Sequence, residues 1–123
     1  MHCTAVGKAL LSTLPEEEVR HILEIKGMTR YTPNTIVDPD SLMVYLKEIK
    51  ASKISVETEE NEIGIICLGT PVFDYSGRAI GAISVSGPAE RIKEKGIERI
   101  GQAMKNAGEE ISAQMGFDFF QKP

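Results

Sequence analysis

Residues 62–88 read EIGIICLGTPVFDYSGRAIGAISVSGP, and this stretch decides the fold of the 123-residue chain. Two runs rich in β-branched and apolar residues, one ending at Phe73 and one beginning at Ala79, are typical of β-strands. Ser76 and Gly77 stand between the two runs, where such a turn-forming pair indicates a hairpin. The stretch therefore predicts two long strands joined by a tight turn.

Helical patterns flank this predicted hairpin on both sides. Upstream, helices are expected over residues 3–14 and 15–27 and from Asp38 onward. Asp38 is a suitable N-cap for the third helix, because Pro39 follows it at the first helical position. Downstream of the hairpin, an apolar stripe at helical spacing predicts a long terminal helix. The residues of this stripe are Ile97, Ile100, Met104, Ala107, Ile111 and Met115.

A third strand is predicted just before the hairpin. After Lys53 the pattern turns from helical to extended, since the apolar Ile54 and Val56 alternate with polar residues. For three helices, three strands and then helices, an α/β (α+β) fold with an antiparallel sheet flanked by helices is the economical arrangement. Residues 1–123 are expected to form one domain. Because three strands barely suffice for a stable sheet, we expect missing N-terminal strands or a partner chain to complete it.

The composition is that of an ordinary folded domain, with 41% hydrophobic and 26% charged residues. No apolar run approaches the roughly 18 residues of a membrane span, and the first residues lack the features of a signal peptide. Together with two cysteines, which fit reduced thiols, this predicts a cytoplasmic chain without membrane contact. The net charge of −4 argues against DNA binding by this chain alone. Lys47, Lys50 and Lys53 recur at helical spacing and are interpreted as a solvated helix face.

Two serines in the second hairpin strand are candidates for ligand binding. Ser84 and Ser86 occupy alternate positions, so their hydroxyl groups share one face and can together grip a carboxylate. Pairing about the turn brings Cys67 near Ser86, within a slip of a residue or two, with Glu57 at the rim of the group. The spacing fits a pair of serines on a solvated sheet face equally well.

Cys67 and the start of the first helix admit chemical as well as structural interpretations. A thiol on a strand can be a nucleophile or a metal ligand, but the neighbours of Cys67 are apolar, which favours a buried and inert cysteine. No paired-ligand spacing supports a zinc site, and we expect no metal. Gly7 and Lys8 lie where free N–H groups of a helix can receive an anion, although Gly7 is as typical of close helix packing.

A family resemblance is carried by four segments of the chain. They are HCTAVGKALLSTLPEEE, YTPNTIVDP, EENEIGIICLGTPVFDYSGRAIGAISVSGP and the closing amphipathic helix. In order and spacing they resemble the effector domain of IclR-family bacterial transcription regulators, KdgR-like members among them. The resemblance covers nearly the whole chain and implies a GAF-like domain without the winged helix that contacts DNA. The effector-binding pocket would then comprise the backbone around Ala5 and Val6 and the side chains of Glu57, Cys67, Ser84 and Ser86.

The resemblance also implies a function. The chain would be the effector-sensing and oligomerisation domain of a transcriptional regulator, binding a small organic or keto acid such as 2-keto-3-deoxygluconate. It would assemble as a homodimer or homotetramer, contact DNA only through a winged-helix domain outside this chain, and require neither cofactor nor reaction. The alternative is a GAF-like enzyme with Cys67 as nucleophile or redox thiol. Glu57 stands where the family usually has Asp, and its extra methylene shortens the pocket or redirects the carboxylate.

Overall fold

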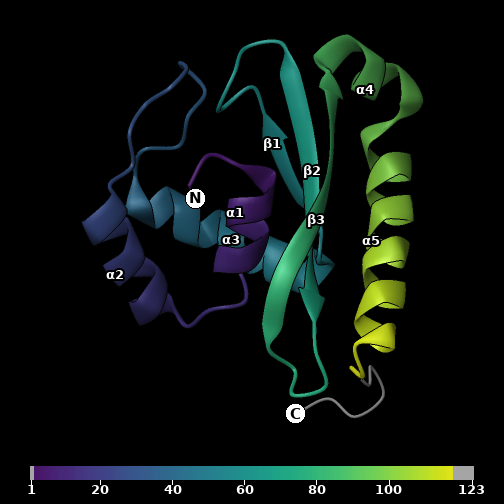
Figure 1. Ribbon diagram of the computed structural model, residues 1–123. Coiled ribbons are helices and arrows are strands. Elements are labelled where there is room, and N and C mark those ends of the chain that lie inside the picture. The colour runs from purple at the N-terminus through teal and green to yellow at the C-terminus, as the bar shows by residue number, and fades with distance from the viewer. Residues whose placement is uncertain (1, 118–123) are drawn as a thin grey trace.

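The computed structural model describes residues 2–117 and contains an antiparallel sheet with helices on both of its faces (Figure 1). This is the α+β arrangement predicted from the sequence, with three helices before the strands and two after them in the described part of the chain. The elements are α1 (Ala5–Leu11), α2 (Glu16–Lys26), α3 (Pro39–Ser52), β1 (Ser55–Thr58), β2 (Ile65–Phe73), β3 (Ala79–Pro88), α4 (Ala89–Lys95) and α5 (Ile97–Gln114).

The sheet has the strand order β1, β2, β3, and both pairs of neighbouring strands are antiparallel. Gly77 has a φ of 79° and so takes the left-handed conformation in the turn between β2 and β3. An irregularity between Val72 and Phe73 shifts the register near this turn. Beyond it, Cys67 pairs directly with Ser86. The predicted hairpin is confirmed, and so is the predicted proximity of these two side chains.

Small residues let α1 and α5 approach the sheet closely from opposite faces. A Cβ atom at Gly69 in β2 would lie 2.7 Å from the carbonyl oxygen of Ala5, so α1 rests directly on this strand. A Cβ atom at Gly108 in α5 would lie 2.6 Å from Cγ2 of Thr70. Gly69 and Thr70 are consecutive, and consecutive strand residues face opposite sides of a sheet. The strand β2 therefore lies between α1 and α5, as Figure 1 shows.

Two clusters of buried side chains hold these layers together. Each fully buried leucine, isoleucine or valine contributes roughly 1.5–3 kcal/mol, so the clusters are a main source of stability. The cluster formed by α1, α2 and α3 consists of Leu11, Val19, Leu23, Leu42, Met43, Leu46 and Ile49. The cluster between the sheet and the helices α4 and α5 consists of Ile66, Leu68, Ala89, Ile92 and Met104.

The apolar stripe predicted for the last helix is only partly the buried face of α5. Met104 is buried, but Ala107 is exposed and Met115 is 48% exposed. The reason is that α5 lies close to the sheet at Gly101 and Gly108, where a larger side chain would not fit between helix and strand. The buried residues of α5 are Gly101, Met104, Gly108 and Ser112.

Capping residues set the ends of the helices before the sheet. The N-cap Thr4 and the C-cap Ser12 both lie inside the predicted range 3–14, so α1 is shorter than predicted. The side chain of Thr4 accepts a hydrogen bond from a backbone N–H of the first turn and thereby fixes the start of the helix. The third helix begins as predicted, with Asp38 as N-cap and Pro39 in the first turn.

Candidate functional site

Side chains from all three strands form a row across the sheet. Glu57 of β1 pairs with Cys67 of β2, and Cys67 pairs with Ser86 of β3. Directly opposed residues of antiparallel strands point to the same face. Two residues along β3, Ser84 lies opposite Gly69, which marks this face as the one that α1 covers. The strand register thus brings together the four strand residues predicted for the site.

The first turn of α1 lies against the same part of β2. The Ala5 carbonyl oxygen and the Val6 nitrogen lie 2.7 Å and 3.2 Å from the position of a Cβ at Gly69. Since Gly69 is two residues from Cys67 and opposite Ser84, Ala5 and Val6 lie beside the row of strand residues. Backbone N–H groups in the first turn of a helix have no intrahelical partner and can donate to a ligand. All six predicted residues therefore gather where α1 meets the sheet.

Glu57 is buried, whereas the sequence suggested a place at the rim of the site. It is only 2% exposed, and its carboxylate accepts hydrogen bonds from the backbone N–H groups of Glu60 at 3.4 Å and Asn61 at 3.3 Å. Burial raises the pKa of Glu57, and the two hydrogen bonds oppose this shift. The carboxyl group therefore holds the loop between β1 and β2 in place, and spacing alone did not indicate this contact.

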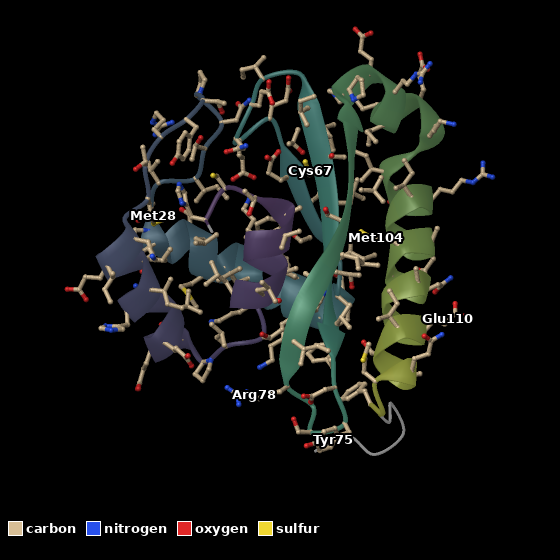
Figure 2. All side chains as sticks on the ribbon, in the orientation of Figure 1. Met28, Cys67, Tyr75, Arg78, Met104 and Glu110 are labelled. Carbon is tan, nitrogen blue, oxygen red and sulfur yellow. The ribbon has the colours of Figure 1, made fainter. Side chains whose placement is uncertain are left out.

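Cys67 is half-buried in the middle of the row (Figure 2). Burial raises the pKa of its thiol, the negative charge of Glu57 raises it further, and a hydrogen bond with Ser86 lowers it. Nucleophilic cysteines need the opposite shift, because the thiolate is the reacting form. The sequence has two histidines that could activate a thiol: His2 bonds through Nε2 to the carbonyl oxygen of Thr29 at 2.8 Å, and His21 lies exposed on α2.

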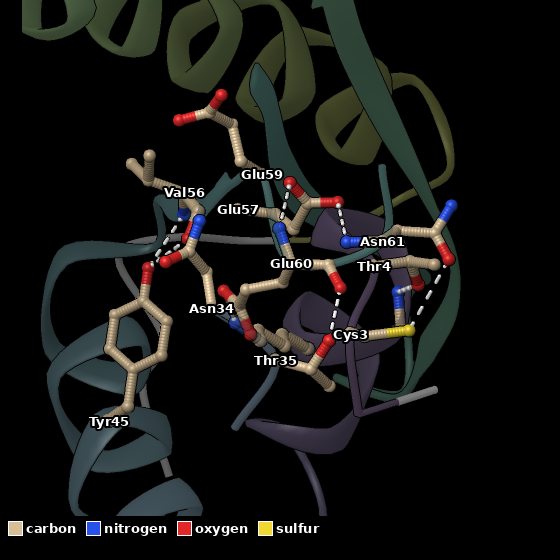
Figure 3. A network of polar contacts seen from close by, with 12 residues as sticks. Cys3, Thr4, Asn34, Thr35, Tyr45, Val56, Glu57, Glu59, Glu60 and Asn61 are labelled. Carbon is tan, nitrogen blue, oxygen red and sulfur yellow. Dashed lines mark hydrogen bonds and ion pairs between the residues drawn. The ribbon is translucent and has the colours of Figure 1, made fainter. Parts of the chain in front are cut away.

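A network of polar contacts fixes the loop between β1 and β2 beside the row (Figure 3). The hydroxyl of Thr35, from the segment between α2 and α3, donates to the carbonyl oxygen of Glu60. From the start of the chain, Sγ of Cys3 lies 3.5 Å from Oδ1 of Asn61. This loop is thus tied to two segments that lie far from it in the sequence.

Lys8 does not have the anion-binding role that its place near the start of α1 suggested. Its side chain is fully buried, and its ammonium group forms an ion pair with Glu60. The same Nζ atom lies 4.8 Å from the centre of the Tyr45 ring. Gly7 is buried as well, in agreement with its alternative interpretation as a residue for close packing. No local pattern predicts the ion pair, because its members lie 52 residues apart.

The site is open to solvent along β3, an outer strand of the described sheet, where Ser84 and Ser86 are exposed. Two hollows, of about 550 and 640 Å³, lie elsewhere and include none of the six predicted residues. Within residues 2–117, no three His, Cys, Asp or Glu side chains are grouped to hold a metal ion. In that same range no helix has the length and apolar character to cross a membrane.

Comparison with known proteins agrees with the resemblance seen in the sequence. The family described as bacterial transcriptional regulator IclR C-terminal matches residues 1–113. The chain belongs to the IclR family. The transcriptional repressor AllR of Salmonella typhimurium is 34% identical over 116 residues, which make up 94% of this chain and 43% of AllR. The chain thus spans less than half the length of the curated relatives it matches.

Solved structures of IclR-family regulators share the fold. IclR of Thermotoga maritima matches with a TM-score of 0.87 and 40% identity, over 94% of this chain and 47% of its own. A double mutant of the PobR inducer-binding domain from Acinetobacter, in complex with 3-hydroxybenzoic acid, matches with a TM-score of 0.84 and 30% identity. That match covers 90% of this chain and 66% of the PobR chain. The predicted family and fold class are confirmed, while the six site residues stay a prediction.

Proposed function

We propose that this chain senses a small organic acid for an IclR-family regulator, and that the acid binds where α1 meets the sheet. The strand register carries this proposal, because it sets Ser86 beside Cys67 and Ser84 beside Gly69, on which α1 rests. The proposed site comprises the backbone of Ala5 and Val6 and the side chains of Glu57, Cys67, Ser84 and Ser86.

The chemistry of these groups suits an anionic ligand. The hydroxyls of Ser84 and Ser86 can donate hydrogen bonds to a carboxylate, and the first-turn N–H groups of Ala5 and Val6 supply further donors. The thiol of Cys67 stays neutral at neutral pH, because burial raises its pKa. The carboxylate of the acid would therefore meet donors and a neutral thiol, while the Glu57 carboxylate accepts hydrogen bonds from the backbone N–H groups of Glu60 and Asn61.

Two relatives support an acid as the ligand of a regulator. The PobR inducer-binding domain was solved in complex with 3-hydroxybenzoic acid, and AllR is a transcriptional repressor. A keto or hydroxy acid, with 2-keto-3-deoxygluconate as one candidate, carries a carboxylate and a neutral hydrogen-bonding group, and the site offers donors for both. From the PobR complex and the donors of the site we infer that the ligand of this chain is a small organic acid.

The whole regulator would respond through differential affinity. An acid that binds one arrangement of subunits more tightly shifts the population toward it, and only that difference can move attached DNA-binding domains. The regulator would be cytoplasmic and would act as a homodimer or homotetramer. It would contact DNA through a winged-helix domain outside this chain.

Binding without catalysis is the better supported function, because the relatives are transcriptional regulators. An enzyme using Cys67 would need a thiolate near neutral pH. Burial and the charge of Glu57 both act against thiolate formation. We therefore infer that the chain requires no cofactor and performs no reaction.

A thermal-shift screen of small keto and hydroxy acids at millimolar concentration tests this function. A ligand that binds only the folded state raises the unfolding midpoint by mass action. We expect one class of acid to raise the midpoint of the wild type and to lose this effect in a Ser84→Ala, Ser86→Ala variant. The matched control is Val85→Ala, because Val85 lies between the serines and points to the opposite face.

The control variant should keep the full shift. Equal shifts in the wild type and the double-serine variant would mean that the acid binds elsewhere on the chain. If none of the acids gives a saturable shift, the proposed sensing function of this chain is rejected.

A further inference from the structure

A hollow of about 640 Å³ lies at the end of the molecule that carries Tyr75 and Arg78 in Figure 2. Its volume is in the range of small-molecule sites. Residues from the ends of α1 and α3, from β2 and from the second half of α5 line it. The six residues of the proposed acid-sensing site are not in its lining, so the hollow is a separate feature.

The lining of this hollow is positively charged, although the chain has a net charge of −4. Lys50, Lys53 and Lys105 line it, together with the carboxylate of Glu109. The sequence suggested a solvated helix face for Lys47, Lys50 and Lys53. Lys47 and Lys50 are exposed on α3, in agreement with that interpretation, and Lys53 is the C-cap of the helix. The structure brings Lys105 of α5 to the same hollow as Lys50 and Lys53, and this concentrates positive charge in a concave place.

Aromatic rings form an apolar wall next to these cations. The ring centres of Phe73 and Phe117 lie 5.2 Å apart, and Pro71 is part of the same lining. The Nζ atom of Lys53 lies 5.3 Å from the centre of the Phe73 ring. A ligand that matches both parts of the hollow has a flat apolar body and an anionic group.

The C-terminal ends of α1 and α3 both line the hollow. Carbonyl groups at the C-terminal end of a helix carry partial negative charge. The Ser12 hydroxyl donates to the carbonyl of Ala9 at 2.6 Å, and the Thr13 hydroxyl donates to that of Leu10 at 2.7 Å. These carbonyls already accept hydrogen bonds, and the lining holds three ammonium groups against the one carboxylate of Glu109.

We propose that this hollow binds a small aromatic carboxylate. Its ring packs against Phe73 and Pro71, and its carboxylate pairs with Lys50 and Lys105. Hydrogen bonds between ionised groups are roughly twice as strong as neutral ones, so two ammonium groups in a partly enclosed place favour an acid over a neutral ring. This site is independent of the acid-sensing face, and each proposal stands or fails without the other.

Titration of the ¹⁵N-labelled chain with benzoate, followed by NMR, tests this site. We expect saturable shifts of the backbone amide signals of Thr70 and Phe73. Lys50→Gln and Lys105→Gln should each weaken benzoate binding about tenfold or more, because each removes a charge-assisted bond. Lys47→Gln is the matched control, since Lys47 lies on the same helix outside the hollow and should leave the affinity unchanged. Unshifted signals elsewhere in each variant show that it is folded.

Two further measurements are needed. One distinguishes the contribution of the aromatic ring from that of the carboxylate, and the other distinguishes the hollow from the proposed acid-sensing site. Acetate and inorganic phosphate lack the ring and should bind at least about tenfold more weakly than benzoate. The Ser84→Ala, Ser86→Ala variant should bind benzoate in the hollow with unchanged affinity. The proposal is overturned if acetate binds as well as benzoate, if Lys105→Gln keeps the wild-type affinity, or if the shifts are confined to signals near Cys67.

Discussion

Lys8 and Glu60 lie 52 residues apart in the chain, and their side chains form an ion pair that is almost fully buried. The two side chains are 0% and 8% exposed. The pair joins α1 directly to the loop between β1 and β2, and both of these elements flank the proposed acid-sensing site. We therefore expect it to fix the position of Ala5 and Val6 relative to the sheet.

Replacing Lys8 by methionine should destabilise the fold by about 3–5 kcal/mol, because Glu60 would remain as an unpaired buried charge. The double variant Lys8→Met, Glu60→Gln should recover part of this loss, since neither charge is then left. Urea denaturation measures the free energy of unfolding of each variant. Lys47→Met, at an exposed lysine of α3, is the control and should stay within about 0.5 kcal/mol of the wild type. A loss for Lys8→Met no larger than this would show that the pair contributes nothing.

Gly69→Ala should destabilise the fold and weaken acid binding. The added Cβ would lie 2.7 Å from the Ala5 carbonyl oxygen, so α1 would have to move away from β2. Overpacking of this kind costs about 1–3 kcal/mol. Gly81→Ala on β3 is the matched control, because no atom lies within 4 Å of its Cβ position. Thermal unfolding with and without the acid measures both effects, and equal behaviour of the two alanine variants would contradict the close seating of α1.

Tyr45 blocks the outer edge of β1. Its hydroxyl donates to the carbonyl of Val56 and accepts a hydrogen bond from the Val56 N–H at 2.9 Å. Tyr45→Phe should cost about 1–3 kcal/mol, because both backbone groups lose their partner. It should also promote aggregation on warming, since an unpaired strand edge can pair with another chain.

Denaturation and light scattering measure these two effects of Tyr45→Phe. The control is Tyr75→Phe, at a side chain that is 81% exposed, and neither measurement should change for it. If Tyr45→Phe is as stable and as soluble as this control, water replaces the hydroxyl at the edge and the proposed protection is absent.

The part of the site on β2 and β3 could be predicted from the sequence. Side chains alternate along a strand, so Ser84 and Ser86 had to share one face, and the turn at Ser76 and Gly77 predicted Cys67 near Ser86 within a slip of a residue or two. The direct pairing of Cys67 with Ser86 depends in addition on the irregularity between Val72 and Phe73, which the sequence did not indicate. The family resemblance added Ala5 and Val6. Local sequence patterns carry information about neighbouring residues within a strand or a helical turn. Such patterns are sufficient to predict a hairpin.

Contacts between distant segments could not be predicted in this way. Lysine is rarely buried, so no pattern indicated that Lys8 lies inside and pairs with Glu60. The burial of Glu57 was also missed. Its hydrogen-bond partners are backbone N–H groups in a loop, and no side-chain pattern indicates such partners. The seating of α1 on Gly69 also depends on the packing of whole elements. The sequence pattern describes single elements well and their mutual contacts poorly.

The reactivity of Cys67 should respond in opposite directions to changes at its two neighbours in the row. The charge of Glu57 raises the pKa of the thiol, and the hydrogen bond with Ser86 lowers it, on top of the larger rise caused by burial. Glu57→Gln should therefore lower the midpoint of the pH profile of alkylation, and Ser86→Ala should raise it. Iodoacetamide reports this midpoint, because it reacts with the thiolate.

The rate is measured from neutral to alkaline pH in a Cys3→Ser background, so that only Cys67 reacts. The same chain unfolded in urea provides the reference midpoint. Because burial raises the pKa of Cys67 in the folded state, the folded chain should contain less thiolate than the unfolded chain at every pH below its own midpoint. A folded midpoint below the reference, unmoved by Glu57→Gln, would contradict this prediction and would favour the thiol enzyme over the sensor.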